Sequence, residues 1–545
     1  MNARPSFDLL RSPWIRVRRL SGESDELSLI DAFAQAESCS SLAGELPTQD
    51  FAVLRLMIAI LRRSHASAHG VEDWGDLFNL GRVDTAAVEA YLQPYAERFD
   101  LLHCTTPFYQ VAGLSTAKGA MSELSKLIPD VPAGHAYFTT RAGPALEAMP
   151  FAEAARWIVH CQAFDPSGIK SGAVGDERVK GGKGYPIGVG WCGNLGGVQV
   201  EGSTFFETLM LNLRLSTKRT ADDLPVWERP PPTAASVPRE PTGPLDLLTW
   251  QSRRIRLDHD GEQATGVLIA NGDALHPRNR MNAEAMTNWR FSEPQTKTHG
   301  DGNPVFMPLE HRPDRQVWRG LGGILAAAAP PSTAAHRPPD GGWLDWLAKL
   351  RDDEIIPSGQ PLRVRAIAVH YGAQNSVIDD IGDDALSLRA AVLGDRRLRV
   401  LAVDAVHDAD TAARLLAGLA AELGEAAGVS GEGVDTRRSH GREETYDALD
   451  GPYRRWLAEL VPGDDTDSKR LAWQHIVIKT TLEISRSLVE GAGPSAWIGR
   501  EVTRFNDRVV YLDAALADVG FRRRLREAFP QPDDQPNPAP HEGKP

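Results

Sequence analysis

The sequence predicts an α+β protein, with a mixed α/β N-terminal domain followed by a C-terminal antiparallel four-helix bundle. Short segments that alternate apolar and polar residues, as half-buried strands do, all lie before residue 376. From about residue 377 to residue 529, apolar residues recur at helical spacing in long segments with short turns between them. Long amphipathic helices with short connections pack as an antiparallel bundle. We therefore expect domains at 1–375 and 376–530, followed by a disordered tail at 531–545.

The N-terminal domain is expected to begin with a strand and then a helix. Trp14–Arg18 alternates apolar and polar side chains, which predicts a strand. A helix should begin near Thr48 and Asp50, which can cap it. Its apolar residues recur on one face, and cations follow where the helix dipole favours them: Val53, Leu54, Met57, Leu61, Arg62 and Arg63.

Further elements of this domain follow the same patterns. Residues 85–99 and 205–215 are predicted helices, and residues 254–257, 266–269 and 362–370 are predicted strands. Two Pro-rich stretches lie among them and are expected to be exposed connectors, at 228–243 and 328–342.

The bundle is expected to consist of several helices separated by proline and glycine. Leucine and isoleucine recur on one face around residues 415–423 and again around 471–489. A further helix is expected from about 495 to 529. Gly451-Pro452 and Pro462-Gly463 mark breaks between helices.

Charge and composition exclude two classes of protein. The 545 residues include 60 Lys and Arg against 73 Asp and Glu, a net charge of −13, so the chain is not a wholly basic nucleic-acid coat protein. A local basic groove is still compatible with this charge, because binding depends on where the charges lie. With 42% hydrophobic residues, the chain is not disordered throughout.

The cysteines and the apolar stretches point to a cytoplasmic protein. The cysteines at 39, 104, 161 and 192 form no C-x-x-C pair, so neither a zinc knuckle nor a thioredoxin-type pair is expected. The N-terminal residues contain no apolar signal core. The longest strongly apolar stretch is Leu56–Leu61, far shorter than the roughly 20 residues that span a bilayer, so no membrane segment is expected.

Glycine is too dense between residues 164 and 200 for the interior of a helix or strand. Between residues 166 and 190 the net charge is +2 (4 − 2), from Lys170, Arg178, Lys180 and Lys183 against Asp176 and Glu177. Glycine lets a backbone approach phosphates closely, and interleaved lysines can contact them. These residues leave two interpretations open, a long flexible surface loop and a nucleic-acid contact.

Two nucleotide-binding motifs are only partly matched. Gly188–Gly193 fits G-x-G-x-x-G, but a loop and a strand are expected after it where a dinucleotide site needs a helix. Lys180–Gly184 resembles a phosphate-binding loop, yet Gly184 stands where that loop needs a hydroxyl. We therefore expect no cofactor.

Two His-Asp dipeptides, His259-Asp260 and His407-Asp408, could belong to a metal-dependent phosphohydrolase. Such an enzyme needs further His and Asp ligands from neighbouring helices, and no such set is evident in the sequence. Two surface dipeptides are the simpler interpretation, so no metal and no catalytic residue is expected.

Gln374 and Asn375 follow a predicted strand and the pair Tyr371-Gly372. A turn that projects an amide can be an ordinary connector. It can also be a wedge, because amides hydrogen-bond to base edges.

Taken in order, these segments resemble one family, the large subunit of the type I-E CRISPR surveillance complex Cascade (the Cse1/CasA family). The resemblance covers most of the chain. It rests on four segments: Leu9–Val17 (LLRSPWIRV), Thr106–Gln110 (TPFYQ), the Gly-rich stretch Gln162–Val200, and Ala373–Ile378 (AQNSVI).

The resemblance implies a non-enzymatic subunit that works with a guide RNA (crRNA) and the other Cascade subunits. Such subunits read the protospacer-adjacent motif of foreign double-stranded DNA, mostly from the minor groove. They help to open the duplex for guide-RNA pairing and present the displaced strand to a helicase–nuclease. The protein reads a short motif while base pairing reads the long target, a division of labour known from a different effector.

The resemblance also implies site residues. The motif-reading glycine loop falls at Pro166–Gly172, with a competing choice at 180–184; together these give Gly168, Lys170, Gly172, Lys180, Gly181, Gly182, Lys183 and Gly184. The family's wedge matches Gln374, beside Asn375.

The family's lysine finger falls near Arg278 and Arg280, where lysine is absent, with Lys297 as a second candidate. Arginine can do similar work, because it favours narrow minor grooves. A further loop that touches the guide RNA matches 135–141, with Tyr137, Phe138 and Arg141 as candidate contacts, although both aromatics could equally belong to the core. Leu257–Gly261 lacks the cysteines that some relatives carry there, so no zinc is expected.

The leading hypothesis is therefore a motif-reading subunit of an RNA-guided complex. Two alternatives stay open at this point. One is the metal-dependent phosphohydrolase that would use His259, Asp260, His407 or Asp408. The other is a scaffold protein that contacts no nucleic acid.

Overall fold

The first strand forms where the alternation of side chains predicts it. The computed structural model describes residues 5–129, 144–215, 220–325, 342–503 and 508–530. In it β1 (Ile15–Arg19) buries Ile15 and Val17. It pairs antiparallel with β2 (Ser24–Leu27) and β3 (Cys39–Leu42) in the order β2-β1-β3.

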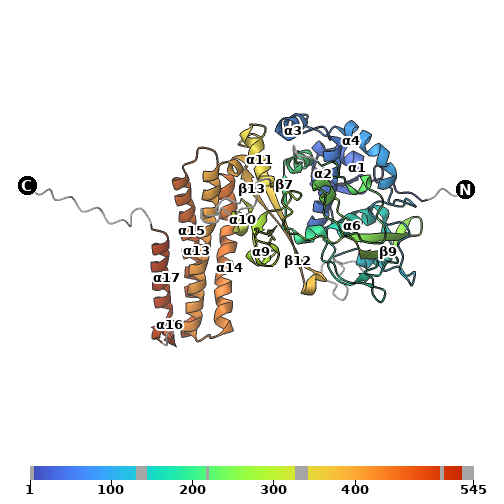
Figure 1. Cartoon of the computed structure of the whole chain (residues 1–545). Helices are drawn as coiled ribbons and strands as arrows, with labels where there is room; N and C mark the ends of the chain where they lie inside the picture. Colours follow the sequence, from blue (N-terminus) through green and yellow to red (C-terminus); the bar gives the residue numbers. More distant parts are fainter. Residues whose placement is uncertain (1–4, 130–143, 216–219, 326–341, 504–507, 531–545) are drawn as a thin grey trace, which may run out of the picture. The chain divides into compact units, whose positions relative to one another are not determined.

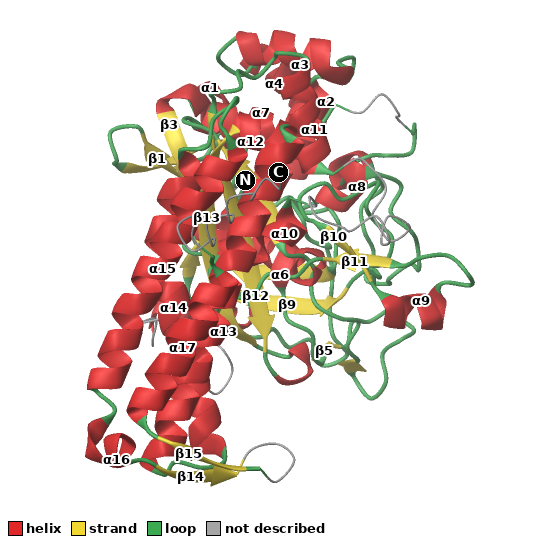
Figure 2. Ribbon diagram, turned by 90° about the vertical axis from the view of Figure 1, so that its left-hand side faces the viewer, coloured by secondary structure: helices red, strands yellow, loops and turns green. Residues whose placement is uncertain are grey.

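The chain divides into two units, Met1–Leu386 and Ser387–Pro545. The first unit mixes helices with small antiparallel sheets, and the second is mainly helical (Figures 1 and 2). The predicted fold class is thus confirmed. The sequence analysis placed the boundary between residues 375 and 376, and the division of the structure falls at Leu386.

Two buried helices, α2 (Pro47–Ser64) and α6 (Phe151–Phe164), pack against each other in the first unit. Proline in the first turn starts α2, because its fixed φ suits a helix and its missing N–H is not needed there. The predicted caps of α2 have other partners. Thr48 Oγ1 lies 2.9 Å from His160 Nε2, and Asp50 accepts the backbone N–H of Gly44.

The remaining sheets of the first unit carry the segments that matter for the site. One sheet has the order β4-β9-β8, another has the order β13-β12-β7, and two further sheets pair β5 with β6 and β10 with β11. Their bounds are Met149–Pro150 (β4), Lys170–Ser171 (β5), Lys183–Gly184 (β6), Gly197–Glu201 (β7), Arg253–His259 (β8), Gln263–Asn271 (β9), Trp289–Phe291 (β10), Phe306–Pro308 (β11), Pro361–Tyr371 (β12) and Ile378–Arg389 (β13).

The other helices of this unit are short. The predicted helix over 85–99 is α4 followed by a 3₁₀ segment (Gln93–Phe99), and the predicted helix at 205 is α7. The helices are Leu29–Ala34 (α1), Gly70–Asn79 (α3), Thr85–Leu92 (α4), Pro144–Glu147 (α5), Phe205–Asn212 (α7), Pro244–Leu248 (α8), Glu293–His299 (α9), Leu321–Ile324 (α10) and Trp343–Asp352 (α11).

The second unit is built around one long helix. After α12 (Ala390–Gly394), α13 (Arg396–Ala427) packs against α14 (Glu432–Ala458), α15 (Thr466–Glu490) and α17 (Ala514–Ala528) (Figure 2). The connections at 428–431 and 459–465 are short, so α13, α14 and α15 run antiparallel. Buried residues from three of these helices fill the core, among them Leu416, Trp473 and Phe521.

The helical prediction is wrong at two places. Residues 378–389 form β13, because Gly382 and four aspartates disfavour a helix while the apolar residues at its end alternate, with Leu386 and Leu388 buried. The single helix predicted from 495 to 529 is instead α16 (Gly493–Ile498), β14 (Arg500–Thr503), β15 (Val509–Leu512) and α17. Gly499, at φ +70, ends α16.

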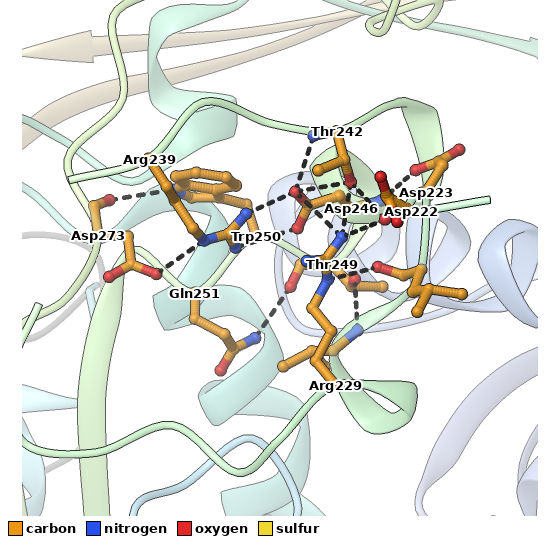
Figure 3. A network of polar contacts seen from close by, with 12 residues as sticks. Asp222, Asp223, Arg229, Arg239, Thr242, Asp246, Thr249, Trp250, Gln251 and Asp273 are labelled. Atoms are coloured by element: carbon orange, nitrogen blue, oxygen red, sulfur yellow. Dashed lines mark hydrogen bonds and ion pairs between the residues drawn. The ribbon is translucent and has the colours of Figure 1, made fainter. Parts of the chain in front are cut away.

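The first Pro-rich stretch, 228–243, is fixed to the protein, so the prediction of an exposed connector holds only in part. Arg239 donates to both oxygens of Asp246 on α8, at 2.5 and 3.0 Å, and its guanidinium lies 4.1 Å from the ring centroid of Trp250 (Figure 3). Arg229 Nη2 lies 3.4 Å from the same carboxylate. The two arginines therefore clamp both ends of the stretch to a buried aspartate.

Three further expectations meet the structure as follows. Across the described residues, no helix has both the length and the apolar character needed to cross a membrane. All four cysteines carry free thiols. The predicted tail 531–545 and residues 328–341 of the second connector lie outside the described residues.

A buried ion pair joins α2 to the segment that precedes β10. Arg55 donates to both oxygens of Glu284 at 2.8 Å, and both side chains are at most 2% exposed. Trp191 Nε1 donates to the same carboxylate at 2.7 Å. Burial alone would raise the pKa of Glu284, but the charge of Arg55 and the hydrogen bonds from Arg55, Trp191 and the backbone of Met286 together outweigh burial and hold the pKa below its ordinary value.

Replacing Glu284 by glutamine should lower the free energy of unfolding by about 3–5 kcal/mol, because Arg55 would remain as an uncompensated buried charge. Urea denaturation followed by tryptophan fluorescence measures this loss. Glu293→Gln is the matched control, since its pair with Lys297 on α9 is exposed. The control should change stability by less than about 0.5 kcal/mol. Equal losses in the two variants would show that the buried pair has no special role.

Candidate nucleic-acid interface

The glycine loop, defined as Pro166–Gly172, starts after α6, where Asp165 is held by two cations. Lys170 Nζ lies 2.6 Å from Asp165 Oδ2, and Arg253 donates to the same oxygen. Burial alone would raise the pKa of Asp165, but the charges of Lys170 and Arg253 and the hydrogen bonds that both donate together outweigh burial and hold the pKa below its ordinary value. The carboxylate therefore stays charged and anchors the loop.

Arg253 also ties the two ends of the glycine-rich stretch together. Its Nη2 donates to the carbonyl oxygens of Pro166 (3.0 Å) and Gly188 (2.9 Å). The side chain is 1% exposed, so these bonds are protected from water. The stretch between them is therefore a loop with a fixed base.

The same end of α6 anchors the strand that leads to the predicted wedge. Tyr371, the last residue of β12, donates its hydroxyl to the carbonyl of Phe164 at 2.8 Å. A Cβ on Gly193 would lie 2.2 Å from the Tyr371 hydroxyl oxygen, and a Cβ on Gly190 would lie 2.6 Å from the carbonyl oxygen of Ala163. These two glycines of the G-x-G-x-x-G match therefore permit close packing. Gly193 lies within a short 3₁₀ segment (Trp191–Asn194), and the strand expected after the match is β7.

The glycine loop and the wedge turn, defined as Ala373–Ser376, are bonded to each other. Ser167 N donates to the carbonyl of Asn375 at 2.7 Å, and a Cβ on Gly168 would lie 4.0 Å from Ser376 Cβ. Gly168 has φ +124, which L side chains rarely adopt. Beside this contact lies a pocket of about 320 Å³, lined among others by Ser125, Lys126, Ser167, Gly168, Ser171 and Ser376.

The wedge turn projects exposed amides from a constrained backbone. Gln374 and Asn375 are both exposed and both left-handed, with φ +57 and +55. Asn375 N donates to Gly372 O, Gly372 N donates to Val377 O, and Ser376 Oγ donates to Ala373 O. Consecutive non-glycine residues in this conformation are uncommon and mark a position where function is a reasonable hypothesis.

The competing lysine-rich segment forms a tight turn. Lys180 and Lys183 exchange two backbone hydrogen bonds at 3.1 Å, and Gly181 and Gly182 between them have φ +59 and +75. This is the geometry of a two-residue hairpin with glycine at both central positions. All four of these residues are exposed, so the turn presents two lysines to solvent.

The other three predicted residues of the glycine-rich stretch are occupied inside the protein. Lys170 is engaged by Asp165 and is 15% exposed. Gly172 is buried, and a Cβ there would lie 2.6 Å from the carbonyl oxygen of Gly182. Gly184 is buried in β6, opposite Lys170. These three residues therefore support the backbone of the stretch from inside the protein.

The predicted finger residues lie on a different segment. Arg280 pairs with Glu240 of the clamped 228–243 stretch and donates to the carbonyl of His276 at 3.1 Å. Between Arg278 and Arg280, Asn279 is left-handed and is bonded through its backbone and side chain to Phe306 of β11. Lys297 is exposed on α9 and pairs with Glu293. The contacts of Arg280 and Lys297 thus differ from those that join the glycine loop to the wedge turn.

The candidate guide-RNA residues Tyr137, Phe138 and Arg141 lie outside the described residues. The His-Asp dipeptides are described. Asp260 accepts the N–H groups of Glu262 and Gln263 in a hairpin turn, while His407 is exposed and Asp408 is bonded to Arg470 and Gln474. In the described part of the chain, no group of three or more His, Cys, Asp or Glu side chains could hold a metal ion.

Sequence reasoning did not identify the residues that assemble this interface. Asp165, Arg253 and Tyr371 are far apart in the chain, and each is buried or half-buried. Only one local signal was available, since Asp165-Pro166 lies at the beginning of the glycine-rich stretch.

Comparison with known proteins gives a consistent result. The family described as CRISPR-associated protein Cse1 matches residues 8–484. The crystal structure of Thermobifida fusca Cse1 is similar with a TM-score of 0.88 and 43% identity, over 96% of this chain and 98% of that chain. The CRISPR-associated protein CasA/Cse1 of Thermus thermophilus is 24% identical over 515 residues, 91% of this chain and 93% of its own length. A chain described as belonging to a CRISPR RNA-guided surveillance complex shares the fold, with a TM-score of 0.69 and 19% identity over 96% of this chain and 99% of that one.

His160 lines the pocket and should make the stability of the protein depend on pH. Burial lowers the pKa of His160 to about 3, whereas an unfolded histidine titrates near about 6.5. The unfolded chain therefore binds the extra proton first, and stability falls as the pH drops from about 6.5 towards 3. His160→Gln should remove about 2 kcal/mol of this loss between pH 6.5 and 5, measured by denaturation at each pH. His407→Gln, a surface change in the second unit, should leave the profile unaltered. Parallel profiles for wild type and His160→Gln would contradict this assignment.

Proposed function

The chain belongs to the CRISPR-associated Cse1 family, and on that premise we propose that it is the non-catalytic large subunit of an RNA-guided CRISPR surveillance complex. In this role it recognises the protospacer-adjacent motif in foreign double-stranded DNA and helps to destabilise the duplex for guide-RNA pairing. It then recruits the helicase–nuclease. Its partners are the guide RNA, the other subunits of the complex, the target DNA and that nuclease.

The observation that carries this proposal is the bond between the glycine loop and the wedge turn. Ser167 N donates to Asn375 O, which keeps Gly168 and the exposed amide of Gln374 on one continuous surface. A backbone without side chains can enter a minor groove closely, and an amide can bond to the acceptors at its floor. This surface can therefore sense a short motif and touch the next base pair at the same time.

The energetics favour a rigid reader. Unstacking a base step costs a few kcal/mol, which must be offset by contacts and by guide-RNA pairing. The backbone of the wedge turn loses little conformational entropy on binding, because its hydrogen bonds already hold Gln374 and Asn375 in their left-handed conformations. Preorganisation of this kind leaves more of the contact energy for opening the duplex.

The charge distribution supports the same role. Within 166–190, Lys170 and the exposed Arg178 are paired with Asp165 and Asp176, so the exposed cations that pair with no carboxylate of the described residues are Lys180 and Lys183. Two lysines provide modest attraction to phosphate, and the net charge of the chain is −13. The proposal therefore assigns most backbone binding to the partner subunits and only motif reading and opening to this chain.

Assembled guide complexes, prepared with and without this chain, test the proposal. The affinity for targets that have or lack the flanking motif should differ only when the chain is present. Filter binding or anisotropy at one fixed salt concentration measures all four cases, since such affinities depend strongly on salt. Equal affinities in the four cases would exclude motif recognition by this chain.

Gln374→Ala should slow the opening of the first target base pairs while leaving the initial contact with the motif nearly unchanged. The reason is that the change removes the projecting amide but not the glycine loop. Stopped-flow fluorescence of a base analogue beside the motif follows opening, and anisotropy follows initial binding. Gln316→Ala serves as a control, because Gln316 belongs to neither the glycine loop nor the wedge turn and precedes the 3₁₀ segment Val317–Gly320. An unchanged opening rate would make the wedge assignment wrong.

A further inference from the structure

The small β5–β6 sheet has two unlike faces. Its register pairs Lys170 with Gly184 and Ser171 with Lys183. Continuing this register by one step places Ile169 opposite Tyr185. Along a strand, every second side chain points to the same face of the sheet. Ile169 and Tyr185 therefore lie on the face of Ser171 and Lys183. The opposite face carries Lys170 and Gly184.

Burial agrees with this division. Lys170 is engaged by Asp165, and Gly184 is buried where a Cβ would lie 3.0 Å from Asn271 Nδ2. On the other face Ile169 is 59% exposed, Tyr185 is 53% exposed, and Lys183 is also exposed. One face is thus packed against the protein, and the other presents an apolar side chain, an aromatic ring and a cation to solvent.

The tip of this sheet holds an unfavourable pair of charges. Lys180 and Lys183 are directly opposite each other and exchange two backbone hydrogen bonds. Like charges in directly opposed positions destabilise a strand pair. Within the described residues, neither lysine pairs with a carboxylate. An anion placed between them would remove the repulsion.

We propose that this outer face, Ile169, Lys180, Lys183 and Tyr185, binds one unpaired nucleotide of the opened target DNA. Its base stacks on Tyr185 against Ile169, and its phosphate lies at the two lysines. The rise from Lys183 to Tyr185 is roughly 6.6 Å, a spacing that the phosphate and base of one nucleotide can bridge. The inference rests on the proposed function, since an unpaired base arises only where the duplex is opened.

The position of the face fits this occupant. Ile169 lies two residues after Ser167, whose N–H is bonded to Asn375 of the wedge turn, so a base released at Gln374 would emerge next to this outer face. The backbone is held in place, because Asn271 Nδ2 donates to the carbonyl of Tyr185 at 2.6 Å. Proteins that bind single-stranded nucleic acid without sequence preference commonly combine aromatic side chains with nearby cations. A nucleotide offers a base that stacks on the ring of Tyr185 and a phosphate that neutralises the two lysines. An apolar protein surface would leave the repulsion between the lysines in place.

The test uses the assembled guide complex and a target whose first base pairs beside the motif are mismatched, so that no opening step is needed. Tyr185→Ala should weaken binding of this pre-opened target by roughly 5- to 150-fold, the range for loss of one stacked base. Tyr185→Phe should bind as wild type does, because it keeps the ring. Tyr511→Ala is the matched control, since Tyr511 is equally exposed but lies in the second unit.

Two further readouts separate this inference from loss of folding and from failure of the proposed function. With 5-iodouracil at the unpaired position, ultraviolet light should crosslink the DNA to Tyr185, as mapped by mass spectrometry. Lys180→Gln combined with Lys183→Gln should lower the salt slope of binding by about 0.7 for the phosphate lost, without lowering the melting temperature of the free chain.

The outcomes are distinct. If the wild-type complex does not discriminate targets by the motif, the proposed function fails. The wild-type complex can instead discriminate targets by the motif while Tyr185→Ala binds the pre-opened target as wild type does, or while the crosslink maps to another residue. Either result would make the assignment of the outer face wrong and leave the proposed motif recognition intact.

Discussion

The buried contact between Asp165 and Arg253 is the constraint on which the interface depends. Asp165 ends α6, and Arg253 begins β8, so one ion pair joins the central helix to a sheet. Arg253 also donates from Nη2 to the carbonyls of Pro166 and Gly188, which closes the base of the glycine-rich stretch, and from Nη1 to the carbonyl of Ser252. A buried charge pair is stable only when its other hydrogen-bonding groups are also satisfied, and here the loop backbone satisfies them. The loop and its anchor therefore stabilise each other.

Glycine has two separate roles around this anchor. At Gly190 and Gly193 the missing Cβ lets the chain pass against α6 and under the Tyr371 ring, which places the end of β12 beside the glycine loop. At Gly168 the left-handed backbone brings the loop to the wedge turn. The first role fixes the distance between two segments, and the second sets the direction in which one of them faces. A high glycine content therefore produces a fixed surface here, although the same composition on its own is also typical of a flexible loop.

The sequence predicted the elements whose apolar residues recur regularly, such as β1, α2 and β12, and it predicted the fold class. It failed at β13, where acidic residues on the exposed face obscure the alternation, and at the β14–β15 hairpin, which interrupts a helical pattern. For the site, Gly168 and Gln374 were identified through a resemblance to a family. Lys170 was predicted to face DNA because composition counts charges without their partners, and the structure pairs it with Asp165. A buried pair between residues 88 positions apart leaves no local pattern in a sequence.

The contrast between the buried anchor at Asp165 and the exposed wedge turn makes the proposed action on DNA compatible with a net charge of −13. A protein that recognised DNA through electrostatic attraction to the phosphates would need many cations, and it would bind any duplex with similar affinity. A protein that recognises DNA through shape needs a rigid surface, because its conformation must not change when it contacts a duplex that resists opening. The left-handed conformations of Gln374 and Asn375 each cost on the order of 1–3 kcal/mol and persist because bonds on both sides hold them. One of those bonds comes from Ser167 of the glycine loop, so the segment proposed to sense the motif also holds the segment proposed to open the duplex. Under the proposed function, this backbone contact would couple recognition to opening without a large movement of the protein.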